Sequence, residues 1–260
     1  MSKDQSRQDL SLPVLLKSGT QKPAVFLVPG IGGSAVDFVS LAKYIPGSRS
    51  IYALQPRGLD GLDSPCDRIE EMAEYYLQIV LWSQPQGPYI LVGYSLGGMV
   101  AMEMARILIA RQQEVALLVM IDSYPDIRSL SPIQSLRLFA RRKNRRLVNF
   151  VFSSRRNNHV ADPAPPDGTA VAASFPEQLR VSATLALRRY RPRPFGGAVR
   201  FIRAATVTEF PKDPQPVWSH LVRALSVETV TGDHLDLLNG QSEKLAAVLS
   251  RYLESLTSSE

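Results

Sequence analysis

The stretch YILVGYSLGGMVAMEMA, residues 89–105, joins a short apolar run to an alanine- and methionine-rich run through a serine flanked by glycines. The apolar run predicts a strand buried on both faces, and the second run predicts a helix. The motif GYSLG at residues 93–97 fits the pattern G-x-S-x-G, whose sharp strand-to-helix turn exposes a serine hydroxyl and needs glycine on both sides. We interpret Ser95 as a catalytic nucleophile. The alternative is a packing turn whose serine only caps the helix.

Further apolar runs surround this stretch and alternate with helical patterns. Short apolar runs that predict strands occur at residues 24–29, 50–55, 115–122, 198–204 and 225–230. Apolar residues with helical spacing occur at residues 69–82, 96–110 and 242–256. Strands that alternate with helices predict an α/β fold with a mostly parallel, doubly wound sheet. Functional side chains of such sheets lie at the carboxyl ends of strands, where Ser95 and Asp122 are both expected.

One long segment, residues 125–197, interrupts this alternation between the strands that end near Asp122 and start near Ala198. Its flanks, residues 131–152 and 176–190, have helical patterns, and a proline-rich loop separates them. An insertion of this length at the functional edge of the sheet predicts a helical lid.

The composition fits a single globular domain. The chain has 260 residues, of which 45% are hydrophobic. We expect a flexible, polar leader at residues 1–22 and one domain at residues 23–260. Cys66 is the only cysteine, which excludes an internal disulfide bond and is typical of a reducing compartment. We interpret Cys66 as incidental. No apolar stretch reaches the roughly 18 residues that a membrane span needs, and no secretory signal is present, so we expect a cytoplasmic protein.

The positive charge of the chain is concentrated in one segment. The formal net charge is +6, and much of the surplus lies at residues 137–156. Such a run attracts phosphates, acidic proteins, anionic membranes or nucleic acid. Few aromatic residues interleave with the basic ones and no nucleic-acid-binding module is predicted, so we do not expect nucleic acid as a partner.

A nucleophilic serine needs a base, and the chain offers three histidines. His234 follows the last predicted strand, so it has the expected place in the chain order serine, then acid, then histidine. His159 lies in the polar part of the insertion, and His220 lies in a helical pattern. We predict that His234 is the base and interpret the other two as surface or packing residues.

The acid that orients the histidine has several candidates. Asp122 ends the strand after the helix that follows the serine. Asp233 is adjacent to the histidine, which makes contact with its Nδ1 difficult, and we expect Asp233 to cap a turn. Glu209 and Asp213 follow the next strand, a position that many hydrolases of this fold use. Position alone favours Asp122 without deciding between them.

The oxyanion of an acyl-transfer intermediate needs two backbone donors. We expect one from the N–H of Leu96, directly after the serine, and one from the loop at residues 28–35, where we predict Ile31. The glycines of that loop also suit a simple tight turn, and the two roles are compatible.

Five stretches together resemble the thioesterase domains that end nonribosomal peptide and polyketide synthases, within the α/β-hydrolase superfamily. They are FLVPGIGGSAVDF, IYALQPRGLDG, GPYILVGYSLGGMVAMEMARIL, LLVMIDSYP and VTGDHLDLL, and they extend over residues 26–238 apart from the insertion. The resemblance implies the α/β-hydrolase fold. It also implies that Asp122 is the acid, His234 the base, and Ile31 and Leu96 the oxyanion donors.

The resemblance further implies a thioesterase that releases an acyl, polyketide or peptidyl chain from the phosphopantetheine arm of a carrier protein, by hydrolysis or cyclisation, without a metal or other cofactor. Carrier proteins are typically acidic, so the basic residues of the insertion are candidate contacts with the carrier or its phosphopantetheine, although a solvated helix explains them equally well. These residues are Arg141, Arg142, Lys143, Arg145 and Arg146. The alternatives are a carboxylesterase or lipase that acts on oxygen esters and a non-catalytic binding protein with a hydrolase shell.

Overall fold

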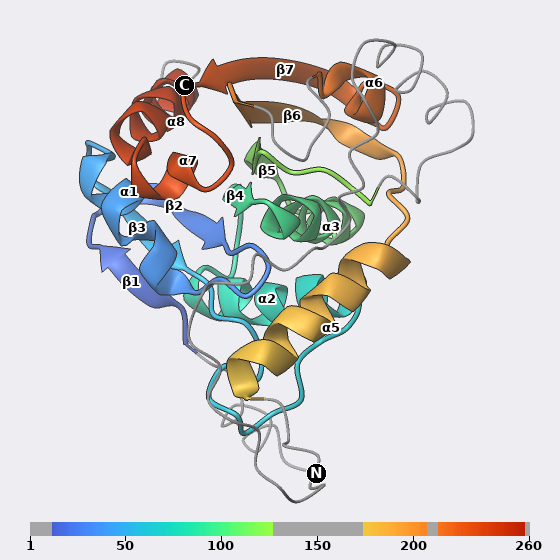
Figure 1. The fold of residues 1–260 in the computed structure, drawn as a ribbon. Coiled ribbons are helices and arrows are strands. Elements are labelled where there is room, and N and C mark those ends of the chain that lie inside the picture. The colour runs from blue at the N-terminus through green and yellow to red at the C-terminus, as the bar shows by residue number, and fades with distance from the viewer. Residues whose placement is uncertain (1–11, 127–173, 207–212, 258–260) are drawn as a thin grey trace, which may run out of the picture.

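The strands form one sheet in the part of the chain that the computed structural model describes, which is residues 12–126, 174–206 and 213–257 (Figure 1). They are β1 (Val14–Lys17), β2 (Gln21–Val28), β3 (Arg49–Ala53), β4 (Tyr89–Tyr94), β5 (Val115–Ile121), β6 (Phe195–Ala204) and β7 (Val222–Val230). Their order in the sheet is β1-β3-β2-β4-β5-β6-β7. Among these strands, β1 pairs antiparallel with β3 and every other pair is parallel. The predicted α/β architecture is therefore confirmed.

Helices cover both faces of the sheet (Figure 1). The helical elements are η2 (Ala35–Phe38), α1 (Val39–Tyr44), α2 (Ile69–Ser83), α3 (Leu96–Ala110), α5 (Phe175–Arg189), α6 (Gln215–Trp218), α7 (Asp236–Asn239) and α8 (Ser242–Thr257). Buried side chains of α2, α3, α5 and α6 belong to the core on one face. Those of η2, α1, α7 and α8 belong to the core on the other face.

The central strands are apolar throughout because both of their faces are buried. Along β2, Phe26 packs into the core under α2 and α3, whereas Leu27 packs into the core under α1 and α8. Along β4, Leu91 and Val92 divide between the same two cores. Successive side chains of a strand point to opposite faces, so this alternation follows from the pleat of the backbone.

The prediction of a flexible leader up to residue 22 is wrong for the residues just before β2. Residues 14–17 form β1 at the edge of the sheet, and β2 itself begins at Gln21. The backbone between them is fixed as well, since the Gly19 N–H donates to the Ser50 hydroxyl oxygen over 3.1 Å and that hydroxyl donates to the Gly19 carbonyl oxygen over 2.8 Å. The sequence analysis did not predict this strand, because β1 is short, lies in a polar segment and pairs with β3, which is distant in the sequence.

The insertion contributes α5, which confirms the helix predicted at residues 176–190. Ala183 and Ala186 of this helix pack into the same core as α2 and α3. A proline within the first two positions, an acidic residue in the first turn and two arginines in the last turn suit the helix dipole. The helix predicted at residues 131–152 lies outside the described residues. Within the described ranges, no helix combines the length and the apolar character that crossing a membrane requires.

Candidate active site

Ser95 occupies a strained turn between β4 and α3. Its φ of 55° and ψ of −122° lie outside the regions that residues with a side chain normally adopt. The Ser95 N–H donates to the Ile121 carbonyl oxygen of β5 over 2.8 Å, and the Gly98 N–H donates to the Ser95 carbonyl oxygen over 3.1 Å. The backbone of the serine is therefore held by the neighbouring strand and by the first turn of the helix.

The glycines around Ser95 are required by close backbone contacts. A Cβ atom at Gly93 would lie 2.1 Å from the Gly97 carbonyl oxygen, and one at Gly97 would lie 2.2 Å from the Val28 carbonyl oxygen. A Cβ at Gly98 would lie 2.0 Å from the Ser123 hydroxyl oxygen. These contacts are far shorter than any real Cβ contact, so only glycine fits. The prediction that the turn needs glycine on both sides is confirmed.

Asp122 follows β5 and is fixed through its backbone and both carboxylate oxygens. Its backbone has a positive φ of 46°, and its N–H donates to the Ile202 carbonyl oxygen over 2.7 Å. The Ala204 N–H donates to Asp122 Oδ1 over 3.1 Å, while Asp122 Oδ2 lies 2.8 Å from His234 Nδ1. Asp122 is only 4% exposed. One carboxylate oxygen is thus held by β6 and the other is aimed at the histidine.

His234 lies in the loop between β7 and α7, with its ring against Asp122. A carboxylate only accepts hydrogen bonds, so we assign the imidazole proton to Nδ1, which leaves Nε2 as the nitrogen that can take a proton. This tautomer is the one that a general base beside a nucleophilic serine needs. The structure therefore brings together two residues that lie far apart in the sequence, the base predicted from chain order and the acid implied by the resemblance to thioesterase domains. Their catalytic roles stay predictions.

Tyr94, the residue before the nucleophile, holds the histidine from a second side. Its ring stacks on the imidazole of His234 with centroids 4.8 Å apart and an angle of 18° between the planes. Its hydroxyl donates to the His234 carbonyl oxygen over 2.8 Å. Burial, together with the charge of Asp122, raises the pKa of Tyr94, so its hydroxyl stays protonated and remains a donor. Sequence reasoning missed this contact because no local pattern connects the two residues.

The two backbone groups predicted to form the oxyanion hole belong to segments next to Ser95. Leu96 is the first residue of α3, and the first N–H groups of a helix have no partner within it. Ile31 lies in a tight turn closed by the Gly33 N–H, which donates to the Gly30 carbonyl oxygen over 3.1 Å. A Cβ at Gly30 would lie 3.1 Å from the Ser95 Cβ, so this turn packs directly against the serine. The donor roles of Ile31 and Leu96 stay predictions.

The remaining candidates for the acid do not occupy comparable places. Asp233 Oδ1 accepts from the N–H groups of Leu235 and Asp236, over 2.9 and 3.0 Å, which confirms the expected turn-capping role. Asp213 caps another short turn, since its Oδ1 accepts from the Gln215 N–H over 3.0 Å. Glu209 lies outside the described residues.

The other predicted residues are placed as follows. His220 is exposed just after α6, instead of within a helix as the sequence pattern indicated. His159 lies outside the described residues. The same holds for the five basic residues predicted to contact a carrier, Arg141, Arg142, Lys143, Arg145 and Arg146, so that contact stays a prediction.

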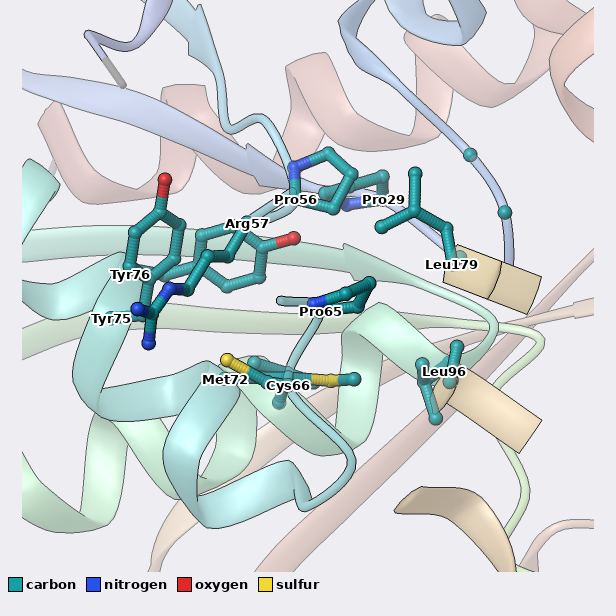
Figure 2. Close-up of a pocket in the computed structure, with 15 residues that line it drawn as sticks. Pro29, Pro56, Arg57, Pro65, Cys66, Met72, Tyr75, Tyr76, Leu96 and Leu179 are labelled. Carbon is teal, nitrogen blue, oxygen red and sulfur yellow. The ribbon is translucent and has the colours of Figure 1, made fainter. Parts of the chain in front are cut away.

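A pocket adjoins the serine turn (Figure 2). It includes about 470 Å³ of empty space, part of it open to solvent. Gly30 and Leu96, which both lie next to Ser95, are part of its wall, and Leu179 of α5 closes one side. The wall also contains Cys66, which the sequence analysis took as incidental. No sequence pattern indicated this pocket, because separate segments of the chain assemble it.

The model of the thioesterase domain family matches residues 23–255. The chain therefore belongs to the thioesterase domain family, a family of serine hydrolases with the α/β-hydrolase type of fold. This class agrees with the strained serine, the buried aspartate and the histidine at one edge of the sheet.

Particular relatives connect this chain with nonribosomal peptide synthesis. It is 38% identical over 126 residues to a dimodular nonribosomal peptide synthase of Bacillus subtilis (strain 168), a match that covers 48% of this chain and 5% of that protein. It is 27% identical over 246 residues to malpibaldin synthetase of Mortierella alpina, covering 92% of this chain and 4% of that protein. The chain thus spans a small part of these relatives.

Two solved thioesterase domains have a similar fold. A covalent complex of the NocB thioesterase domain with a fluorophosphonate nocardicin G analogue is similar with a TM-score of 0.66 and 25% identity, over 90% of this chain and 95% of that one. The Vlm2 thioesterase domain bound with a dodecadepsipeptide is similar in fold, with a TM-score of 0.63 and 17% identity, over 92% of this chain and 96% of that one.

Proposed function

We propose that this thioesterase releases an acyl, polyketide or peptidyl chain from the phosphopantetheine thioester of a carrier protein, through an acyl-enzyme on Ser95. The observation that supports this most is the 2.8 Å contact between His234 Nδ1 and Asp122 Oδ2, together with a serine in a strained turn. A binding protein needs neither the strain nor the buried carboxylate. The family and its relatives favour a thioester on a carrier as the substrate.

In the first step, His234 Nε2 takes the proton of the Ser95 hydroxyl while Oγ bonds to the thioester carbonyl carbon. The carbonyl π electrons move to oxygen, and the N–H groups of Leu96 and Ile31 stabilise the resulting oxyanion. The oxyanion then reforms the carbonyl, the carbon–sulfur bond breaks, and the pantetheine sulfur takes the proton from the imidazolium. Asp122 accepts the Nδ1 hydrogen bond throughout and stabilises the imidazolium.

In the second step, water or a hydroxyl or amine of the same chain attacks the Ser95 ester. His234 takes the proton of that nucleophile and gives it to the Ser95 oxygen as the ester bond breaks. Water yields a free acid, and an internal nucleophile yields a lactone or lactam. Every proton and electron pair in these two steps moves among the enzyme, the substrate and the attacking nucleophile, so neither step requires a cofactor.

Matched substrates test this proposal against an esterase. We would measure kcat/KM for an acyl N-acetylcysteamine thioester and for the oxygen ester of the same acyl group. Because intrinsic reactivities differ, each value is divided by the rate of alkaline hydrolysis of the same compound. We expect the normalised value to favour the thioester. A normalised value that favours the oxygen ester would establish the esterase instead, and a lack of labelling of Ser95 by a fluorophosphonate would overturn the catalytic reading altogether.

A further inference from the structure

The pocket beside Ser95 has one wall formed directly by the catalytic turn. Leu96 follows the serine, and Val100 lies one turn further along α3. Leu179 and Ala183 of α5 also line the pocket. The part of the pocket wall next to the serine turn is therefore formed by aliphatic side chains. This side of the pocket suits an apolar segment of an acyl chain, because it offers that segment burial without polar partners.

The opposite side of the pocket carries polar groups among apolar ones. Figure 2 shows Leu96 and Leu179 at one side and Arg57, Tyr75 and Tyr76 at the other. An otherwise apolar pocket with a few polar groups at one end is typical of a site that orients its ligand. The polar groups are thus separated from the nucleophile by the apolar part of the pocket.

The Arg57 guanidinium has more N–H donors than its ion pair with Asp63 uses. Its Nη2 lies 3.3 Å from Asp63 Oδ1, and both side chains are more than one third exposed. A guanidinium carries five N–H donors, and an exposed ion pair contributes little to stability. The hydrogen bond to Asp63 raises the pKa of Arg57, so the side chain stays charged. A substrate oxygen can therefore share or replace Asp63 at small cost.

Tyr76 supplies a second donor. The residue is only 5% exposed, and its hydroxyl has no hydrogen-bond partner among the residues that the structure describes. Burial raises the pKa of Tyr76, so the hydroxyl keeps its proton. The hydroxyl oxygen itself is not fully buried, since among the described residues only the Tyr252 hydroxyl is a fully buried side-chain polar atom without a hydrogen-bond partner. A hydroxyl in a pocket wall can donate a hydrogen bond when a ligand supplies an acceptor.

We propose that this pocket binds the acyl chain and selects chains with an apolar segment next to the scissile carbonyl and, further along, a carbonyl or carboxylate oxygen that accepts hydrogen bonds from Arg57 and Tyr76. This substrate class rests on the proposed function, since the chain must be attached at Ser95. Peptidyl and oxidised polyketide chains contain such oxygens, whereas plain alkanoyl chains do not.

Substrate pairs test the selection. The probes are N-acetylcysteamine thioesters of one length, with a plain alkyl chain, with an amide in place of two distal methylene groups, and with a distal carboxylate. We expect the wild type to prefer an oxygen-bearing chain in kcat/KM. Arg57→Met should reduce that preference about 10- to 100-fold, and Tyr76→Phe about 5-fold, with little change for the alkyl chain. A wild type that prefers the alkyl chain, or variants that lower all three substrates equally, would overturn the proposal.

A matched control separates selection from general damage. Tyr252→Phe removes a hydroxyl from a tyrosine that is buried in α8, on the opposite face of the sheet. This variant should leave the ratio between the three substrates at its wild-type value. Because Tyr76→Phe breaks no hydrogen bond among the described residues, we expect it to fold as the wild type does.

Cys66 provides an independent test of where the chain lies. It is the only cysteine and lines the pocket, so its alkylation by iodoacetamide reports on access to the pocket. We would label Ser95 with a methyl fluorophosphonate or with one that carries a long, amide-containing chain. We expect the long chain alone to slow alkylation at least 10-fold. Equal alkylation of both labelled forms would overturn the proposed pocket, whereas a failure to label Ser95 would count against the proposed function instead.

Discussion

Around Ser95, hydrogen bonds and close glycine contacts hold the catalytic residues in place. The side of the adjoining pocket that carries polar groups has, in contrast, an exposed ion pair and a hydroxyl without a partner among the described residues. Asp122 is held by β6 on one carboxylate oxygen and by His234 on the other. Arg57, in contrast, holds Asp63 at 3.3 Å on the surface. The comparison separates the part of the site that performs the chemistry from the part that can adapt to a substrate.

This contrast has a physical origin. A transition state tolerates little misplacement, so its donors, base and nucleophile are positioned by elements of the sheet. Recognition of a chain requires groups that are available when the substrate arrives, and these are more weakly satisfied before it binds. Substitutions in the first region should therefore affect turnover of every substrate, and those in the second should affect the choice among substrates.

The largest effect is expected from Asp122→Asn. An amide at this position still accepts from Ala204 but favours the wrong imidazole tautomer at Nδ1, so kcat should fall about 10⁴-fold at neutral pH. Steady-state kinetics with one thioester measures this. Asp233→Asn is the matched control, because the amide oxygen still caps the turn, and it should keep near wild-type activity. Equal losses in both variants would refute the assignment of the acid.

The next effect concerns stability at the serine turn. Gly93→Ala places a methyl group 2.1 Å from a backbone oxygen, so we expect the free energy of unfolding to fall by about 3 kcal/mol or more. Gly196→Ala, where no atom lies within 4 Å of the new Cβ, should change it by no more than about 0.5 kcal/mol. Urea unfolding followed by circular dichroism measures both. Similar values for the two variants would contradict the tight packing of the turn.

A smaller effect should follow from Tyr94→Phe. This change keeps the ring stacked on His234 and removes the 2.8 Å hydrogen bond to its carbonyl oxygen, so turnover should fall about 5-fold. Tyr89→Phe, at the other end of β4, also removes a hydrogen bond to a backbone oxygen, here Gln84, and should leave turnover unchanged. If both variants turned over substrate like the wild type, Tyr94 would not position the histidine.

The smallest effect concerns the Cys66 thiol, whose alkylation should depend on pH differently in the folded and the unfolded protein. Burial raises the pKa of the Cys66 thiol, and Arg57 opposes that shift without reversing it. The thiolate is the reactive form, so alkylation of the folded protein should rise about tenfold per pH unit and continue to rise beyond pH 9. The urea-unfolded protein should level off at lower pH. Identical pH profiles would mean that the thiol is not buried in the pocket wall.

Much of the fold and of the catalytic centre could be predicted from local patterns. The bounds of α3 match the helix predicted at residues 96–110, and β4 ends directly before Ser95, because an apolar strand, a glycine-flanked serine and a helix follow one another without a gap. Asp122 and His234 each follow a strand whose apolar run is visible in the sequence. Chain order then limited the choice of base, and the resemblance to thioesterase domains limited the choice of acid.

The features that sequence reasoning missed all depend on contacts between distant segments. β1 is short and partly exposed, and its place depends on pairing with β3. The stacking of Tyr94 on His234 joins residues whose positions differ by 140. The pocket needs α2, α3, α5 and two loops together. No periodicity or motif within one segment contains this information.

Intact-protein mass spectrometry of the enzyme mixed with a carrier-bound peptidyl thioester tests the central claim most directly. Ser95→Ala and Asp122→Asn variants would be measured beside the wild type. We predict that the acyl mass is added to the wild type at early times and builds up in Asp122→Asn if its deacylation is slowed more than its acylation. The mass should be absent from Ser95→Ala, and peptide mapping should place it on Ser95. Release of product with no adduct on Ser95 in any variant, or an adduct that persists in Ser95→Ala, would contradict the account.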